Sequence, residues 1–307
     1  MDIRKLIKKD AWLAMRNNWG KAFAVVLISF SFLIFTVLIE KLLSYILDVS
    51  YFIDYAQTPA FYLDDITNLG PASFAVLFSA LIIHLLIYSP VSLGNKKWYL
   101  GLAGANPFPV SAVFSYFSGF QNFFKAFCLR FHLLIRKALF WTLINTPAII
   151  VFVLLCLLKF FVASQELFMI QLAFSIIFIC LFLLCQLLAI CFLQRYFLAE
   201  YIYVLYHCKI RDAIKMSVLI MKGHRSEIFS VILSFIPYYI VNILWLPSFA
   251  TIPHMNMVYA IYAKYFIERF EQQKNGTVSE SSGNSNDILD GNTKPLPNIK
   301  EIKFPSM

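Results

Sequence analysis

The residues best suited to chemistry lie together in the stretch Ile220–Phe235. It reads I-M-K-G-H-R-S-E-I-F-S-V-I-L-S-F and places Lys222, His224, Arg225 and Glu227 within six residues. An imidazole near a carboxylate suits proton transfer, and paired cations suit a phosphate group. The residues that follow are apolar or Ser. The stretch is therefore either a polar reactive site or the point where a helix enters a membrane.

The membrane interpretation accounts for each residue of this stretch. Gly223 permits a sharp corner out of a preceding helix. Ser226 is expected to cap the next helix, and Glu227 to favour the positive N-terminal end of that helix. The two cations complement phosphate headgroups. Catalysis by His224 would need a partner nucleophile or acid that the sequence does not identify.

The composition supports a membrane protein. The 307 residues are 60% hydrophobic and 14% charged, whereas soluble domains carry about 25% charge. The net charge of +9 comes from basic residues that flank apolar runs, so anionic lipid is a better partner than nucleic acid. The six cysteines form no C-x-x-C, and no two of the five histidines share metal-ligand spacing. We expect no disulfide framework, metal or cofactor.

Six apolar segments are close to or above the length of about 20 residues that a spanning helix needs. They cover residues 22–39, 72–93, 138–158, 167–193, 228–244 and 247–266. We therefore predict an all-α, polytopic transmembrane helical bundle of about six spans over residues 1–271. The tail, residues 272–307, is rich in Ser, Asn and Gly, and we predict that it is disordered.

The distribution of basic residues predicts the orientation. Residues 1–21, 94–137 and 194–227 contain six Lys or Arg each, whereas residues 40–71 and 159–166 contain one each. Short cytoplasmic loops carry an excess of Lys and Arg. This alternation predicts a multi-pass protein of the plasma membrane with both termini in the cytoplasm.

Amphipathic segments precede two of the predicted entries into the membrane. Ile3–Asn17 and Asp212–Met221 carry apolar residues at helical spacing, and we expect cytoplasmic interfacial helices there. Similar short sequences begin at Asn18, Asn122 and His224. They indicate either a threefold repeat of helical hairpins or a shared use of basic and aromatic residues at membrane entries.

Two sets of polar residues are candidates for function. The first is expected at the lipid headgroups and comprises Arg16, Lys21, Lys125, Lys222, His224 and Arg225. The second lies inside predicted spans and comprises His84, Asn145, Gln186 and Asn242. The second set forms either a polar path or hydrogen bonds between helices. We also expect Asn145-Thr146-Pro147 to break the third span or, as the favoured alternative, to place a proline kink in it.

Several motifs resemble one family of bacterial membrane proteins. They include N-N-W-G-K-A-F, S-P-V-S-L-G, Y-F-L-A-E-Y and, most specifically, A-I-x-x-S-x-x-x-M-K-G-H at Ala213–His224. The chain resembles domain-of-unknown-function family 975, common in Gram-positive bacteria, over Met1–Glu268. It departs at Asn145–Ile149, where members usually have I-P-G-I. The resemblance implies a polytopic membrane protein without an established activity and supplies no catalytic residues.

Three functions remain open. The favoured one is a non-enzymatic membrane module that binds lipid, or a partner membrane protein or peptide. Its role would be envelope homeostasis or protection against membrane-active peptides. The second is a small-solute transporter or channel that uses the intramembrane polar residues. The third is a lipid-modifying enzyme that uses His224 or the pair Asp64–Asp65.

Overall fold

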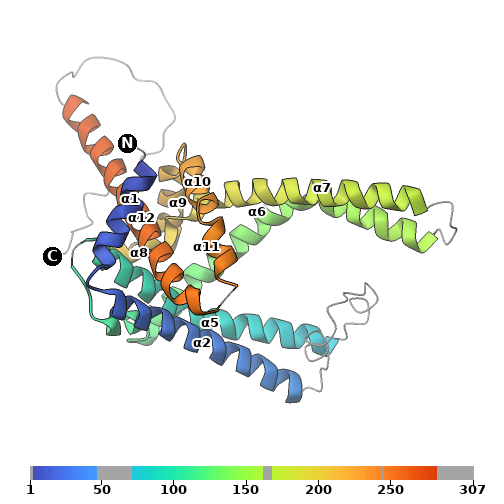
Figure 1. The fold of residues 1–307 in the computed structure, drawn as a ribbon, viewed down its shortest axis with the longest axis horizontal. Coiled ribbons are helices and arrows are strands. Elements are labelled where there is room, and N and C mark those ends of the chain that lie inside the picture. Colours follow the sequence, from blue (N-terminus) through green and yellow to red (C-terminus); the bar gives the residue numbers. More distant parts are fainter. Residues whose placement is uncertain (1–2, 47–70, 105, 162–167, 244, 282–307) are drawn as a thin grey trace. The chain divides into compact units, whose positions relative to one another are not determined.

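The structure, a computed structural model, describes residues 3–46, 71–104, 106–161, 168–243 and 245–281. Every regular element in these ranges is a helix, so the all-helical prediction is confirmed for them. In chain order (Figure 1) they are α1 (Ile3–Met15), α2 (Trp19–Ile46), α5 (Pro71–Ala103), η1 (Val110–Phe114), α6 (Phe120–Phe161), α7 (Phe168–Leu193), η3 (Gln194–Tyr196), α8 (Ala199–Tyr206), α9 (Ile210–Ile220), α10 (Arg225–Leu233), α11 (Ile236–Val241) and α12 (Trp245–Ser281).

Four helical stretches of the described chain are long and apolar enough to cross a membrane. They are Trp19–Ile46, Phe78–Ala103, Phe120–Leu157 and Leu172–Tyr206. Each coincides with or overlaps one of the first four predicted spans. The chain is therefore a membrane protein with at least these four candidate spans.

The apolar region after Glu227 does not form two helices that match the fifth and sixth predicted spans. It contains the short helices α10 and α11, followed by the 37-residue α12. Pro237 has no N–H group to bond the carbonyl of Leu233, and the helix is interrupted between Leu233 and Ile236, just before this proline. Neither the fifth nor the sixth predicted span is among the four candidates.

Helix α6 is longer than the sequence predicted. Its 42 residues begin at Phe120, well before the predicted span at residue 138. A break of the span at Pro147 was wrong, because the helix continues through that residue, and the proline kink stays a prediction. Proline removes only one backbone hydrogen bond, so the long helical segments on both sides of Pro147 can continue the helix.

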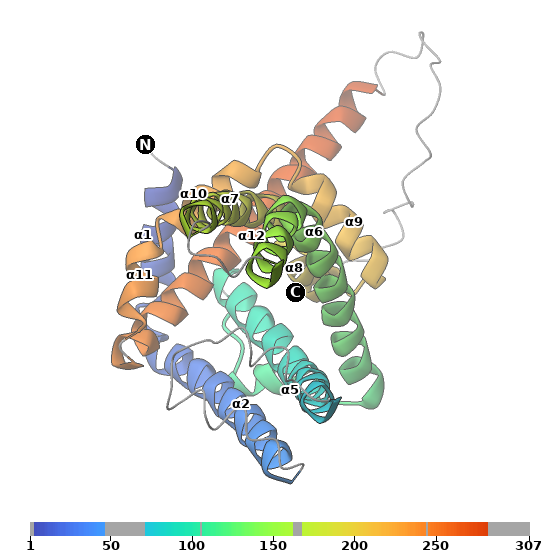
Figure 2. The ribbon, with the colours of Figure 1, turned by 90° about the vertical axis from the view of Figure 1, so that its right-hand side faces the viewer.

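The chain forms two compact units, which we describe separately. Unit 1 comprises Met1–Phe131 and Tyr238–Tyr262, and unit 2 comprises His132–Pro237 and Ala263–Met307. In unit 1, α2 runs alongside α5 (Figures 1 and 2), and α1 and η1 also pack against α5. The side chain of Asn95 on α5 donates a 2.6 Å hydrogen bond to Ser29 on α2.

The contact between α5 and η1 depends on a glycine. A Cβ atom added at Gly94 would lie 1.9 Å from the backbone oxygen of Val113. Only glycine permits this approach of two backbones. The neighbouring Trp98 is fully buried and donates a 2.9 Å hydrogen bond to the carbonyl of Phe108. These contacts fix the turn that precedes α6.

In unit 2, α8 and α9 pack against each other, and α9 also contacts η3. Ser217 on α9 is fully buried and donates a 2.9 Å hydrogen bond to the carbonyl of Arg195 in η3. Helices α6 and α7 form a hairpin whose two rods lie side by side, seen almost end-on in Figure 2. The buried side chains of this unit include Tyr196, Ile202, Met221 and Phe266.

Two helix–corner–helix segments have matching boundaries and matching burial. Trp19 begins α2 and Arg225 begins α10, and these residue numbers differ by 206. At the same separation, the pairs Ile7/Ala213, Ala11/Ser217, Met15/Met221, Ala22/Ile228 and Val25/Val231 are all buried. One face of α1 and one face of α9 are thus packed inside protein. At the entry to α6, Ala126 and Leu129 correspond to Ala22 and Val25 of α2 and are also buried. However, α6 begins at Phe120, three residues before the position that corresponds to Trp19.

Helix α12 continues to Ser281, past the predicted domain boundary at residue 271. Its last described turns include Glu271 and Gln272, which are good helix formers. The remainder of the predicted disordered tail, residues 282–307, lies outside the described residues.

Candidate functional site

The corner between α9 and α10, which we call the polar corner, comprises Lys222–Glu227. Gly223 has a φ of +97°, in the left-handed region that favours glycine, so the expected sharp turn is confirmed. The backbone N–H of His224 bonds the carbonyl of Met221 at 3.2 Å and closes this turn. His224 then occupies the N-cap of α10. The prediction that Ser226 caps this helix was wrong, because the helix begins before that residue.

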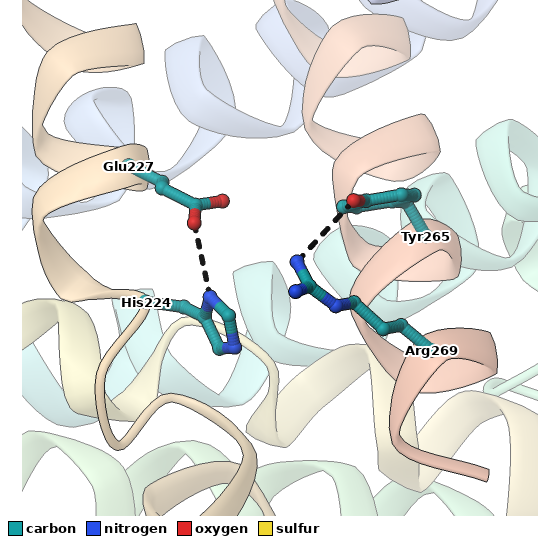
Figure 3. Close-up of polar contacts among 4 residues, drawn as sticks. All are labelled: His224, Glu227, Tyr265 and Arg269. Carbon is teal, nitrogen blue, oxygen red and sulfur yellow. Dashed lines mark hydrogen bonds and ion pairs between the residues drawn. The ribbon is translucent and has the colours of Figure 1, made fainter. Parts of the chain in front are cut away.

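A carboxylate and an imidazole meet at the start of α10. Nδ1 of His224 lies 3.1 Å from Oε1 of Glu227, three residues further along (Figure 3). The side chain of His224 is 25% exposed and that of Glu227 is 45% exposed, so water screens the pair. Such a pair contributes at most about 1 kcal/mol. Glu227 also lies in the first turn of α10, where a negative charge is favoured.

Helix α12 supplies one contact to the polar corner that sequence reasoning missed, and it carries two further polar contacts within itself. The ring of His224 lies 5.3 Å from the ring of Phe266. On the same helix, Nη1 of Arg269 donates a 3.4 Å hydrogen bond to the hydroxyl of Tyr265 (Figure 3). Lys264 and Glu268 form an ion pair at 3.6 Å. At the corner itself, His224 thus has an aromatic contact with Phe266 as well as its contact with Glu227.

The predicted headgroup residues remain accessible in both units. Four of them are exposed: Arg16, Lys21, Lys125 and Lys222. Arg225 is partly buried, and its guanidinium carbon lies 6.0 Å from the centre of the Phe192 ring. Each lies at or near a turn that leads into α2, α6 or α10.

Asn145 and Gln186 are brought together in the α6–α7 hairpin. Nε2 of Gln186 donates a 2.9 Å hydrogen bond to Oδ1 of Asn145. Oε1 of Gln186 accepts a 3.1 Å hydrogen bond from the indole N–H of Trp141, and Nδ2 of Asn145 bonds the carbonyl of Trp141 at 2.8 Å. The predicted hydrogen bond between helices is confirmed for this pair. These polar groups satisfy one another rather than pointing into a common path.

The other two residues that were predicted to lie inside the membrane, His84 and Asn242, have separate partners in unit 1. The ring of His84 stacks on Tyr88 at 5.2 Å, and the guanidinium of Arg130 lies 4.8 Å from the same Tyr88 ring. Asn242 accepts a hydrogen bond from the hydroxyl of Thr251 through its side chain, at the start of α12. Tyr88 lies four residues from His84 on the same helix α5, whereas Arg130 and Thr251 lie on other helices, where a single sequence gives no pairing signal.

Arg195, in unit 2, makes aromatic contacts that sequence reasoning missed. The guanidinium carbon of Arg195 lies 4.2 Å from the Phe140 ring and 5.0 Å from the Tyr196 ring. Nothing in the sequence spacing of Phe140 and Arg195 indicates this contact. Both are partly buried at the base of the α6–α7 hairpin.

The remaining reactive residues show no assembled site in the described part of the chain. There, no group of three His, Cys, Asp or Glu side chains could hold a metal ion. The six cysteines are all free. Burial raises the pKa of Cys208, and nearby Asp212 adds to this rise, so its thiol is the favoured form. The pair Asp64–Asp65 lies outside the described residues.

Fold and site together define an all-helical integral membrane protein whose basic residues cluster at helix entries. The sequence profile of the family described as protein of unknown function (DUF975) matches residues 1–269. The chain therefore belongs to this family. Neither the curated proteins nor the solved structures include a significant match to it.

Proposed function

We propose that this protein is a non-enzymatic membrane module that binds anionic lipid at its basic helix entries. The observation that carries this proposal is the contrast at these entries. Arg16, Lys21 and Lys222 are exposed, whereas Met15 and Met221 beside them are fully buried. The apolar side chains anchor each entry, and the cations stay available to phosphate groups.

The electrostatics favour this binding. A Lys or Arg near an anionic membrane surface contributes about 1 kcal/mol, and the attraction weakens within a Debye length. The cations occur at several entries, so their contributions add where they face the same leaflet. In the cell this binding would serve envelope homeostasis or protection against membrane-active peptides, with a membrane protein or peptide as a further partner.

The topology belongs to the same proposal. Six spans in the plasma membrane, with both termini cytoplasmic, would place every basic entry on one side. The alternation of Lys and Arg along the sequence supports this orientation. The matching boundaries and burial of α1–α2 and α9–α10 support an internal repeat, in which α10–α11 and α12 supply a third, shorter hairpin.

The two alternatives receive less support from the contacts. A transporter would need the intramembrane polar groups to face a shared path, but Asn145 and Gln186 bond each other. A lipid-modifying enzyme would need a reacting partner for His224, whose side chain contacts Glu227 and Phe266. Packing and helix stabilisation account for these contacts.

Lipid preference in reconstituted vesicles tests the proposal. Brominated phosphatidylglycerol and phosphatidylcholine quench tryptophan fluorescence, and two of the five tryptophans, Trp12 and Trp19, with ring centres 5.1 Å apart, lie beside the entry to α2. We expect wild type to prefer the anionic lipid. Replacing Lys21 by Gln should reduce this preference by at most about fivefold at low salt.

Lys41 provides a matched control, because it is an exposed lysine near the opposite end of the same helix α2. Lys41→Gln should leave the preference unchanged. The triple variant Arg16→Gln/Lys21→Gln/Lys222→Gln should lose most of it. Equal preference in wild type and the triple variant would refute the proposal.

A further inference from the structure

Two arginines of unit 2 lie at the same end of α7. Arg195 belongs to η3, which directly follows α7, and Arg225 is the first residue of α10. Helix α10 packs against both α7 and η3. The fold therefore brings two guanidinium groups to one end of this helix from positions 30 residues apart in the sequence.

Aromatic rings hold both guanidinium groups. The guanidinium carbon of Arg195 lies 4.2 Å from the Phe140 ring centre and 5.0 Å from that of Tyr196. The guanidinium carbon of Arg225 lies 6.0 Å from the ring centre of Phe192, which belongs to the last turn of α7. Rings that stack on a guanidinium fix its plane but leave the N–H groups at its edge available.

The hydrogen-bonding capacity of these arginines is not used within the described residues. Nε of Arg195 and Nε of Arg225 are both buried without a hydrogen-bond partner. Among the described carboxylates, none forms an ion pair with either arginine, and Glu227 contacts His224 instead. A partly buried cation without a counter-charge is costly, so an anion at this position would be strongly favoured.

The expected depth of these arginines matches that of lipid phosphates. Helix α7 has 26 residues, or about 39 Å at 1.5 Å per residue. The hydrocarbon core of a bilayer is about 30 Å thick. A spanning α7 therefore extends beyond the core, and Arg195, two residues past its end, reaches the headgroup layer.

We propose that Arg195 and Arg225 together bind the phosphate of one anionic phospholipid. The guanidinium fork matches a phosphate group through paired charge-assisted hydrogen bonds. The apolar rings beside it suit the first carbons of the acyl chains. This inference rests on the proposed function and adds a defined, stoichiometric site to the diffuse attraction of the exposed lysines.

Native mass spectrometry of the full chain, released from detergent micelles, tests this site. With added phosphatidylglycerol, we expect wild type to retain one lipid molecule, and to retain less with phosphatidylcholine. The variant Arg195→Gln/Arg225→Gln should lower the retained phosphatidylglycerol by about tenfold or more, because two charge-assisted contacts are lost. The control Arg211→Gln/Lys215→Gln removes two exposed charges from α9 of the same unit and should retain the lipid.

Three results would overturn the inference. Equal loss in the two double variants would mean diffuse attraction only, and the vesicle preference of the lysine variants would still decide the proposed function. Equal retention of phosphatidylcholine would exclude a site for anionic lipid. Displacement of the bound lipid by millimolar inorganic phosphate would assign the site to free phosphate.

A second variant keeps the test decisive if the Gln substitutions prevent folding. Arg195→Lys/Arg225→Lys preserves both charges but removes the planar fork. We expect it to melt like wild type and still to retain less phosphatidylglycerol. Full retention by this folded variant would contradict recognition by the guanidinium forks.

Discussion

The side-chain amide of Gln186 donates a 2.9 Å hydrogen bond to Asn145 across the α6–α7 hairpin. Asn145 is 1% exposed, so its Oδ1 would lose this buried partner if Gln186 were removed, while its Nδ2 still donates to the carbonyl of Trp141. Hydrogen bonds between membrane helices contribute about 0.6 kcal/mol on average and up to about 1.7 kcal/mol. Together with the hydrogen bond from Trp141 to Gln186, this pair links two helices that also meet through apolar contacts, such as that of Phe152 with Phe178.

A double-mutant cycle should detect this link. We expect Asn145→Leu and Gln186→Leu to be coupled by about 0.5–1.5 kcal/mol in thermal or denaturant unfolding in detergent. Thr146→Val is the control, because the exposed Thr146 bonds only the carbonyl of Thr142 in its own helix. Strictly additive single effects would show that the pair does not stabilise the hairpin.

Three glycine-to-alanine substitutions should differ in sign and size. Gly94→Ala places a Cβ atom against the backbone of Val113 and should cost at least about 2 kcal/mol. Gly223→Ala meets no atom within 4 Å but strains a positive φ, at a cost of about 1–2 kcal/mol. Gly20→Ala, in open space near the start of α2, should stabilise by about 0.5–1 kcal/mol. Melting curves of the three variants check this order, and a destabilising effect at Gly20 as large as at Gly94 would contradict it.

Charge reversal at Glu227 should separate stability from lipid binding. Glu227→Lys places a cation in the first turn of α10 and removes the contact with His224, so we expect a loss of about 0.5–1.5 kcal/mol in stability. The added cation should nevertheless increase the preference for anionic lipid in the vesicle assay. A weaker preference in the folded variant would mean that the carboxylate itself takes part in binding.

Cys208 should react slowly with alkylating reagents. Burial raises the pKa of its thiol above the usual value, and the carboxylate of Asp212 raises it further. Because the thiolate is the reactive form, alkylation at neutral pH should be slower than for a free cysteine and should increase only at strongly alkaline pH. Peptide mass spectrometry after timed iodoacetamide treatment measures this rate, with a Cys-containing peptide as reference. Alkylation at the rate of the peptide at pH 7 would contradict the burial.

The sequence predicted the helices best where apolar residues are continuous. The predicted span at residues 167–193 differs from α7 by one residue at its start and matches its end. The prediction was wrong at the start of α6. There, Lys125 and Arg130 interrupt the apolar run, but the helix continues through them. Arg130 is accommodated by the ring of Tyr88, a partner on α5 that no local pattern reveals.

The candidate site shows the same division between local and distant information. The turn at Gly223 and the position of Glu227 followed from helix-end chemistry, which depends on adjacent residues. The contact of His224 with Phe266 could not be predicted, because these residues lie on separate helices and one sequence carries no pairing signal. The contact of Arg195 with Phe140 was missed for the same physical reason.

The most direct test of the central claim is a local measurement of the lipids around the polar corner. A photo-crosslinking amino acid is placed at Ser226, an exposed residue of the corner, and at Leu42, an exposed residue near the other end of α2. The protein is reconstituted in equal phosphatidylglycerol and phosphatidylcholine, and the lipid adducts are identified by mass spectrometry. We predict phosphatidylglycerol enrichment at Ser226 and bulk proportions at Leu42. Bulk proportions at both positions would contradict the binding of anionic lipid at the polar corner.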